Sequence, residues 1–171
     1  MALLTIRTYP DPVLSKTCSN IESVERPLIE LAENMAETMY HGDRGIGLAA
    51  PQIGESLELI VVDSDPAGQR GTPLFLFNPK IIASEGSEYA EEGCLSLPEH
   101  FAEVERATKV VVQALDREGR PITVEANGLL ARCLQHEMDH LQGKLVLDYV
   151  SPLKRALYRK RRLKELKKAA G

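Results

Sequence analysis

One short segment constrains this chain more than any other: two histidines stand four positions apart with a glutamate after the first, in His136-Glu137-Met138-Asp139-His140. On an α-helix, residues four apart lie on the same face, so both imidazoles can bind one metal ion. Glu137 can then reach a water molecule beside that ion. The pattern His-Glu-x-x-His is expected by chance about 0.01 times in a chain of this length. Its presence therefore predicts a metal site on a helix.

The sequence before the two histidines predicts that the metal-binding face of this helix is buried. Leu129 and Cys133 precede the two histidines at helical spacing, so an apolar stripe runs directly into His136 and His140. The alternative is a pair of solvated histidines on a surface helix. Imidazoles on a buried face need polar partners, and a metal ion supplies them.

The two histidines need a third protein ligand, because catalytic metal sites usually have three. Downstream of His140 the chain has no further histidine, and its only acidic residues are Asp148 and Glu165. Upstream, Cys94 lies in a tight segment, Glu91-Glu92-Gly93-Cys94-Leu95-Ser96, and is the best candidate, binding as a thiolate. The alternative for Cys94 is a small buried hydrophobic residue, which is a common role for a free cysteine.

A glycine-rich segment, Gly45-Ile46-Gly47-Leu48-Ala49-Ala50-Pro51-Gln52, cannot form a regular helix. It lacks the Gly-Lys-Ser/Thr of a phosphate loop, and its glycines permit close approach of the backbone. Gln52 offers a neutral carboxamide donor, which suits an enzyme that must stabilise a developing oxyanion. The alternative is an ordinary turn with an exposed glutamine.

The order of elements predicts an α+β fold with mostly antiparallel sheets around the central metal-binding helix. Strands joined by short turns lie in the middle of the chain, between helical segments. With no repeat or long linker, we expect a single catalytic domain over residues 1–171. The expected helices begin near Pro27, Leu129 and Ser151, the last being a basic C-terminal helix at about 151–170. The expected strands are Leu57–Val62, Leu74–Phe77, Lys80–Ala83, Tyr89–Leu97, Val104–Leu115 and Pro121–Ala126.

Composition limits the cellular setting and the partners. No run approaches the ~20 apolar residues of a membrane span, and the first residues do not form a signal peptide. Three cysteines, an odd number, indicate reduced thiols rather than a disulfide framework. We therefore expect a cytoplasmic protein with neither a membrane nor a DNA partner.

Charge is unevenly distributed along the chain. The whole chain has a formal charge of −4, yet its last 21 residues contain nine basic residues and one acidic residue. This predicts an anionic partner for the C-terminal helix, the alternative being a solvated helix that packs on one side only.

Taken together, three segments resemble the motifs of the peptide deformylase family in identity, order and spacing. They are Gly45–Gln52, Glu92-Gly93-Cys94-Leu95-Ser96 and Gln135-His136-Glu137-Met138-Asp139-His140. The resemblance implies an enzyme that hydrolyses the formyl group from the N-terminal formyl-methionine of nascent polypeptides and releases formate. It also implies one divalent ion per chain, with Fe²⁺ as the native metal and Zn²⁺, Ni²⁺ or Co²⁺ able to substitute. Similar bacterial enzymes contact the ribosome, which we expect of the basic C-terminal helix.

The resemblance also implies a role for particular residues. Cys94, His136 and His140 would bind the metal, Glu137 would be the general acid/base, and Gln52 with the backbone N–H of Leu95 would hold the formyl oxygen. The expected substrate-binding residues are Ile46, Gly47 and Gly93 through their backbone, Arg106 near the peptide, and Leu129 and Cys133 in the methionine pocket.

Two other functions remain as alternatives. A zincin-like endopeptidase would cut internal peptide bonds and would need a third ligand downstream of His140. The second alternative is a non-catalytic metal-binding module, which would give no chemical role to Glu137 and Gln52.

Overall fold

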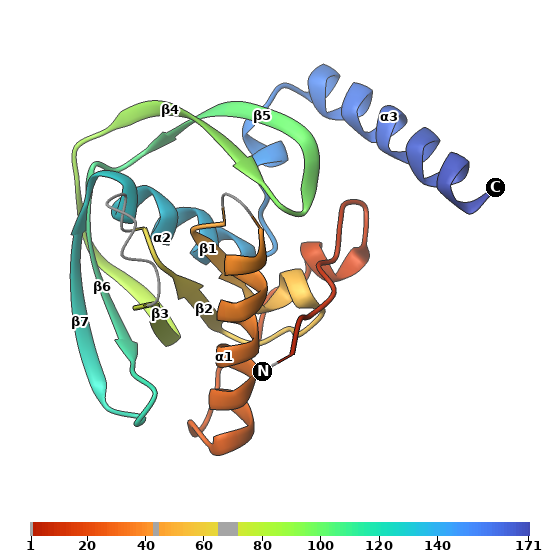
Figure 1. Cartoon of the computed structure of the whole chain (residues 1–171). Coiled ribbons are helices and arrows are strands. Elements are labelled where there is room, and N and C mark those ends of the chain that lie inside the picture. The colour runs from red at the N-terminus through yellow and green to blue at the C-terminus, as the bar shows by residue number, and fades with distance from the viewer. Residues whose placement is uncertain (1, 43–44, 65–71) are drawn as a thin grey trace.

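The computed structural model describes residues 2–42, 45–64 and 72–171 (Figure 1). Within these residues it contains three α-helices, three short 3-10 helices and seven strands. The α-helices are α1 (Arg26–His41), α2 (Gly128–Leu141) and α3 (Pro152–Ala170). The strands are β1 (Gly47–Ala49), β2 (Leu59–Val62), β3 (Leu74–Glu85), β4 (Glu88–Cys94), β5 (Leu97–Arg106), β6 (Lys109–Leu115) and β7 (Pro121–Asn127).

The strands form two sheets, and every pair of neighbouring strands is antiparallel. One sheet has five strands in the order β1-β2-β3-β6-β7, and the other is the pair β4-β5. Helix α2 lies between the two sheets, and α3 extends away from them at the C-terminal end (Figure 1). The predicted α+β class, with mostly antiparallel sheets around a central helix and a C-terminal helix, is confirmed.

Three strand predictions were wrong in their bounds. The strand expected at Tyr89–Leu97 ends at Cys94, and a turn of two residues leads from there into β5 at Leu97. The pieces expected at Leu74–Phe77 and Lys80–Ala83 are one strand, β3, because a bulge after Phe77 accommodates Pro79, which has no N–H to donate. The strand expected over Val104–Leu115 is instead broken between β5 and β6 at Ala107. The side chain of Gln135 bonds to both the N–H and the C=O of Ala107, so a residue from α2 holds this break. Most of the loop expected between β2 and β3 lies outside the described residues.

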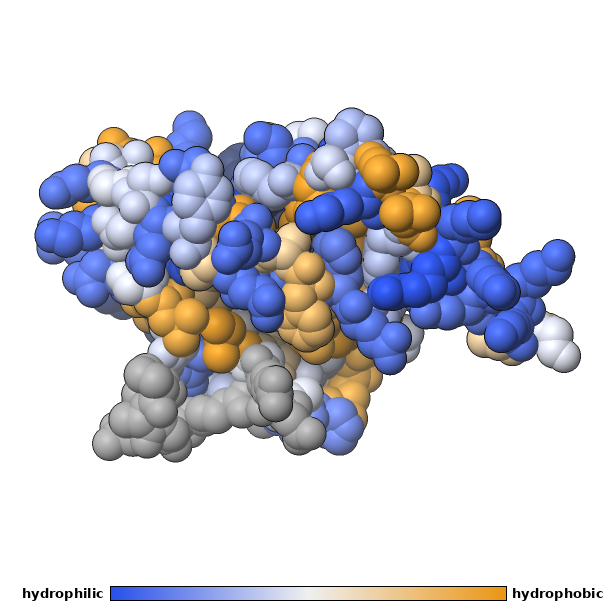
Figure 2. Space-filling model, turned by 90° about the horizontal axis from the view of Figure 1, so that it is seen from above, coloured by the Kyte–Doolittle hydropathy of each residue, from blue (hydrophilic) through white to orange (hydrophobic). Residues whose placement is uncertain are grey.

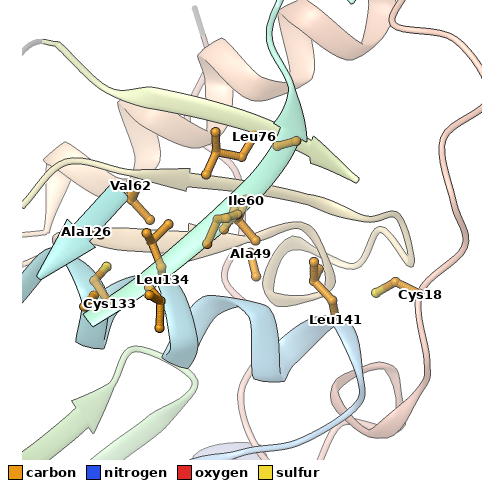
Figure 3. Close-up of a cluster of buried hydrophobic side chains, with 13 residues drawn as sticks. Cys18, Ala49, Ile60, Val62, Leu76, Ala126, Cys133, Leu134 and Leu141 are labelled. Atoms are coloured by element: carbon orange, nitrogen blue, oxygen red, sulfur yellow. The ribbon is translucent and has the colours of Figure 1, made fainter. Parts of the chain in front are cut away.

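Helix α2 is held in place by its apolar face. Cys133 and Leu134 face Ile60 and Val62 of β2 in the core (Figure 3). Leu134, Ile60 and Val62 are fully buried. Each such side chain contributes about 1.5–3 kcal/mol of hydrophobic stabilisation relative to the exposed state. Packing against the sheet thus fixes α2, and with it the two histidines on its C-terminal half.

Helix α3 packs on the rest of the protein through one face only. Tyr158 is buried and donates to the C=O of Pro98 at 3.0 Å, and Arg162 donates to the C=O of Tyr9 at 3.1 Å. Ser151 caps the helix by accepting from the N–H of Lys154, as its position before Pro152 predicts. The far end of α3 forms the mostly hydrophilic projection on the right of Figure 2. None of the helices in the described ranges is long and apolar enough to cross a membrane.

Candidate metal centre and cleft

Two elements bring the three predicted ligands together. Cys94 is the last residue of β4, and His136 and His140 lie one turn apart on α2. One ligand atom from each of the three lies within 4.8 Å of the other two. The pairing of β4 with β5 shifts register between Gly93, which lies opposite Phe101, and Cys94, which lies opposite Leu97. This irregularity interrupts the regular alternation of side chains at Cys94, whose Sγ lies 3.5 Å from the Nε2 atom of His140 on α2.

The geometry of these three residues fits a divalent ion. The Nδ1 atom of His136 lies 2.8 Å from a carboxylate oxygen of Glu92, which leaves its Nε2 for a ligand. The Nε2 atom of His140 lies 3.5 Å from Cys94 Sγ. One sulfur and two ring nitrogens are donors that Zn²⁺, Fe²⁺, Ni²⁺ and Co²⁺ accept.

The surroundings of the two imidazoles also favour a cation. Burial alone would lower the pKa of His136, but hydrogen bonds to Cys94 and Glu92 raise it well above its ordinary value. For His140, burial and the neighbouring His136 lower the pKa. The negative partners therefore stabilise one positive charge at this place, which a metal ion can supply instead of a proton.

Glu137 lies beside this cluster in the interior. The residue is 5% exposed, and its Oε2 atom has no hydrogen-bond partner among the described residues. Burial raises the pKa of Glu137 to about 7. A carboxyl group with a pKa near neutrality can both accept and return a proton.

Gln52 is fixed in a short 3-10 helix and points at the cluster. Its Oε1 atom accepts from the N–H of Ala49 at 2.9 Å, and its Nε2 atom donates to Ser96 Oγ at 3.1 Å. The same Nε2 lies 3.5 Å from Cys94 Sγ. Gln52 is 2% exposed, so the alternative of an exposed glutamine in a turn was wrong. The sequence-predicted donor is thus rigid and adjacent to the three ligand atoms.

A cleft of about 390 Å³ opens onto these residues. Its lining comes mainly from the segment that leads into β1, from β4 and from α2. β1 is an edge strand of the larger sheet, and β4 belongs to the two-stranded sheet. Edge strands can pair with an extended peptide through their backbone groups. The predicted residues that line the cleft are Ile46, Gly47, Gln52, Gly93, Cys94, Leu95, Leu129, Cys133, His136 and Glu137.

His140 and Arg106, which were also predicted, do not line the cleft. His140 is 1% exposed and lies behind Cys94. Arg106 is 5% exposed and donates to both oxygens of Glu92 at 3.0 Å and to Asp139 at 2.6 Å. This differs from the expected place beside a peptide. The physical reason is that the buried carboxylate of Glu92 and the partly buried carboxylate of Asp139 bind the guanidinium.

Sequence reasoning assigned no role to Glu92 or Arg132. Burial would raise the pKa of Glu92, but hydrogen bonds from His136 and Arg106 lower it to about 2. Arg132 lines the cleft and also donates to Glu92. A signal for Glu92 was its place in the segment Glu92-Gly93-Cys94-Leu95-Ser96, two residues before the predicted ligand Cys94.

Comparisons with known proteins agree on one family. The model of the family described as polypeptide deformylase matches residues 3–156. A peptide deformylase of Thermodesulfovibrio yellowstonii is 52% identical over 161 residues, covering 94% of this chain and 97% of the relative. One of Syntrophobacter fumaroxidans is 46% identical over 171 residues and covers 100% of both chains.

Solved structures give the same result for the fold. A peptide deformylase of Ehrlichia chaffeensis in complex with actinonin superposes with a TM-score of 0.91 at 36% identity, covering 96% of this chain and 98% of the other. One of Legionella pneumophila superposes with a TM-score of 0.87 at 45% identity, covering 97% and 98%.

Proposed function

The chain belongs to the polypeptide deformylase family, whose enzymes remove the N-terminal formyl group from nascent peptides, and from this premise we propose how its residues perform that reaction. It is a metal-dependent hydrolase. We assign the single ion to Cys94, His136 and His140. The observation that carries this assignment is the cluster of three ligand atoms within 4.8 Å, with Glu137 beside it.

The native ion is proposed to be Fe²⁺, with Zn²⁺, Ni²⁺ or Co²⁺ able to substitute. The donor set of one thiolate and two imidazoles supports this choice, since all four ions accept it. When bound, such an ion supplies Lewis-acid chemistry, polarising a carbonyl and lowering the pKa of a water molecule. Metal analysis of protein purified without oxygen tests the assignment of iron.

Glu137 is proposed as the general acid/base. It accepts a proton from the attacking water, whose oxygen adds to the formyl carbon. The same carboxyl then returns the proton to the amine nitrogen as the C–N bond breaks, giving formate and a free N-terminus. Its raised pKa of about 7 and its unpaired buried oxygen support this role.

Gln52 and the backbone N–H of Leu95 are proposed to stabilise the oxyanion that forms from the formyl oxygen. The hydrogen bonds of Gln52 to Ala49 and Ser96 support this, because a donor that is already fixed needs no reorganisation during the reaction. Loss of one such donor typically costs about 2.7–4 kcal/mol of transition-state stabilisation.

The substrate is proposed to lie extended between the two walls of the cleft. The backbone of Ile46 and Gly47 on one side, and of Gly93 on the other, would pair with the peptide as strands do. Leu129 and Cys133 would contact the methionine side chain. Both side chains line the cleft from α2, which supports this assignment.

Gly47→Ala is expected to lower turnover about 10–100-fold while the bound metal is kept. A Cβ at this position would lie 2.6 Å from Glu137 Oε1 and 2.8 Å from Cys133 Sγ, so the catalytic carboxyl must shift. Small misplacements of a catalytic group can cost about 10²-fold. Steady-state kinetics with metal analysis measures both effects. Gly42→Ala is the control for added volume, since its Cβ would make only ordinary contacts at 3.7 and 3.9 Å and its φ of −78° is open to any residue; equal losses in both variants would contradict the prediction.

The assay that tests this function measures formate release from a formyl-methionyl tripeptide by the metal-loaded protein. We expect rapid release of formate from the formylated peptide and no release of acetate from the acetylated peptide. Cleavage of internal peptide bonds would favour the endopeptidase alternative. Metal binding without any formate release would favour the non-catalytic alternative.

The basic helix α3 is proposed to bind the ribosome. Its lysines at 154, 160, 164, 167 and 168 are exposed, so their charges are available to an anionic partner. We also propose that residues 1–171 form one catalytic domain that acts in the cytoplasm, where nascent peptides leave the ribosome.

Replacing Lys160, Lys164, Lys167 and Lys168 with glutamine is expected to weaken ribosome binding at least about 10-fold and to reduce its salt dependence, because phosphate contacts release counterions. Turnover of a free formyl-peptide should be unchanged. Sedimentation with purified ribosomes at two salt concentrations measures binding. The exposed sheet lysines Lys80 and Lys109 provide the matched control. Binding that is unaffected by the α3 substitutions, or insensitive to salt, rules the proposal out.

A further inference from the structure

One buried carboxylate, Glu92, receives four donors, and three of them are from arginines. Arg106 contributes Nε and Nη2, each at 3.0 Å, and Arg132 contributes Nη1 at 2.6 Å. The fourth is the Nδ1 atom of His136 at 2.8 Å. A carboxylate has about four lone-pair sites, so those of Glu92 are fully used. Its orientation, and therefore that of the His136 ring, depends on all of these contacts.

Arg132 makes contacts that Arg106 does not. From α2 it donates to the C=O of Val104 on β5 at 2.9 Å and to the C=O of Glu88 on β4 at 2.8 Å. One guanidinium therefore joins α2, which carries two of the proposed metal ligands, to both strands of the small sheet, which carries the third. Its planar array of donors makes this three-way contact possible, and a lysine cannot reproduce it.

We propose that Arg132 is a positioning residue for the metal centre, which holds Glu92 against His136 and holds β4 at a fixed distance from α2. This inference rests on the proposed ligands Cys94, His136 and His140. Through Glu92, Arg132 keeps the Nε2 atom of His136 directed at the site. Through the carbonyls of Glu88 and Val104, it keeps the strand that ends in Cys94 from moving away from the helix.

A purely electrostatic role for Arg132 predicts the opposite change in metal affinity when the arginine is replaced. A positive guanidinium near a divalent cation repels it, so removal of the charge would strengthen metal binding. Removal of a positioning contact weakens metal binding, because outer partners of metal ligands typically contribute 10–100-fold to affinity. The direction of the change in Arg132→Met therefore decides between the two roles.

The experiment loads each protein with Ni²⁺, adds excess chelator and follows the rate of nickel loss by metal analysis. We expect Arg132→Met to lose nickel about 10–100-fold faster than the unchanged protein. Arg132→Lys should fall between them, because it keeps the charge and one contact with Glu92. Arg117→Met is the control, because Arg117 does not line the cleft and forms an ion pair with Glu33, with an N–O distance of 2.6 Å. This variant should lose nickel at the unchanged rate.

A double-mutant cycle tests whether Arg132 acts through Glu92. In a Glu92→Gln background, Arg132→Met should accelerate nickel loss much less than it does alone, because the contact is already altered. Fully additive effects, or unchanged or slower nickel loss in Arg132→Met, overturn the proposal. If Arg132→Met does not fold, Arg132→Lys decides in the same way: nickel loss at the unchanged rate overturns it. Failure of the unchanged protein to bind nickel would instead refute the proposed ligands.

Discussion

Glu137→Gln lowers the turnover of a formyl-methionyl peptide by about 10²–10⁴-fold, which is the usual contribution of a general acid/base, and leaves one metal ion per chain in place. The substitution preserves the volume of a side chain that is only 5% exposed, so the packing around it should change little. It removes the oxygen that would accept the proton of water. Steady-state kinetics and metal analysis on the same sample measure both parts of the result.

Glu91→Gln is the matched control for this prediction. Glu91 also lines the cleft and its side chain is exposed, so the variant loses the same charge from the same cleft. We expect its turnover to stay within a few-fold of the unchanged protein. If Glu137→Gln retained a similar rate, another group would have to transfer the proton and our assignment would be incorrect.

Cys94→Ala should lose most of its bound metal and nearly all of its turnover. Of the three proposed ligands it removes the one that does not come from α2, and two imidazoles alone form an incomplete site. A catalytic metal contributes several kcal/mol to transition-state stabilisation, so the rate should fall by about 10³-fold or more. Metal content after dialysis against a weak chelator, together with formate release, measures the effect.

A second buried cysteine gives the control for Cys94→Ala. Cys18 is 7% exposed and belongs to the hydrophobic core, so Cys18→Ala tests the loss of a buried thiol away from the cleft. That variant should keep its metal even if it is less stable. Stoichiometric, tightly held metal in Cys94→Ala would show that the sulfur is not a ligand.

The helix with the two histidines could be predicted from the sequence because the residues that define it are close together along the chain. The spacing of His136 and His140 sets a common face, and Leu129 and Cys133 predict that this face is buried. Leu129 is 48% exposed, so the prediction holds only from Cys133 onward, which is 4% exposed. Gly143, whose φ of +73° suits glycine, marks where the chain leaves the helix. Packing of Leu134 against the sheet then agrees with the local pattern, so prediction and structure coincide over this part of the helix.

Contacts between distant strands could not be predicted in the same way. Arg106 meets Glu92 and Asp139, which are 14 and 33 positions away, and neither distance leaves a trace in the local pattern. Phe101 is a second example. It pairs with Gly93 across the small sheet, and its ring fills the space where a Cβ of Gly93 would lie, with Cε1 at 2.7 Å from that point. The register of β4 with β5 decides this, and it is a property of the folded sheet.

The short length of β1 limits how many substrate residues can pair with this edge of the cleft. β1 has only three residues, so pairing along it can engage at most about three residues of a visiting chain. Main-chain N–H and C=O groups recur along every polypeptide, so this backbone pairing does not depend on the side chains that follow the first residue of the substrate. The backbone pairing that we propose would therefore accept formylated chains of many different sequences.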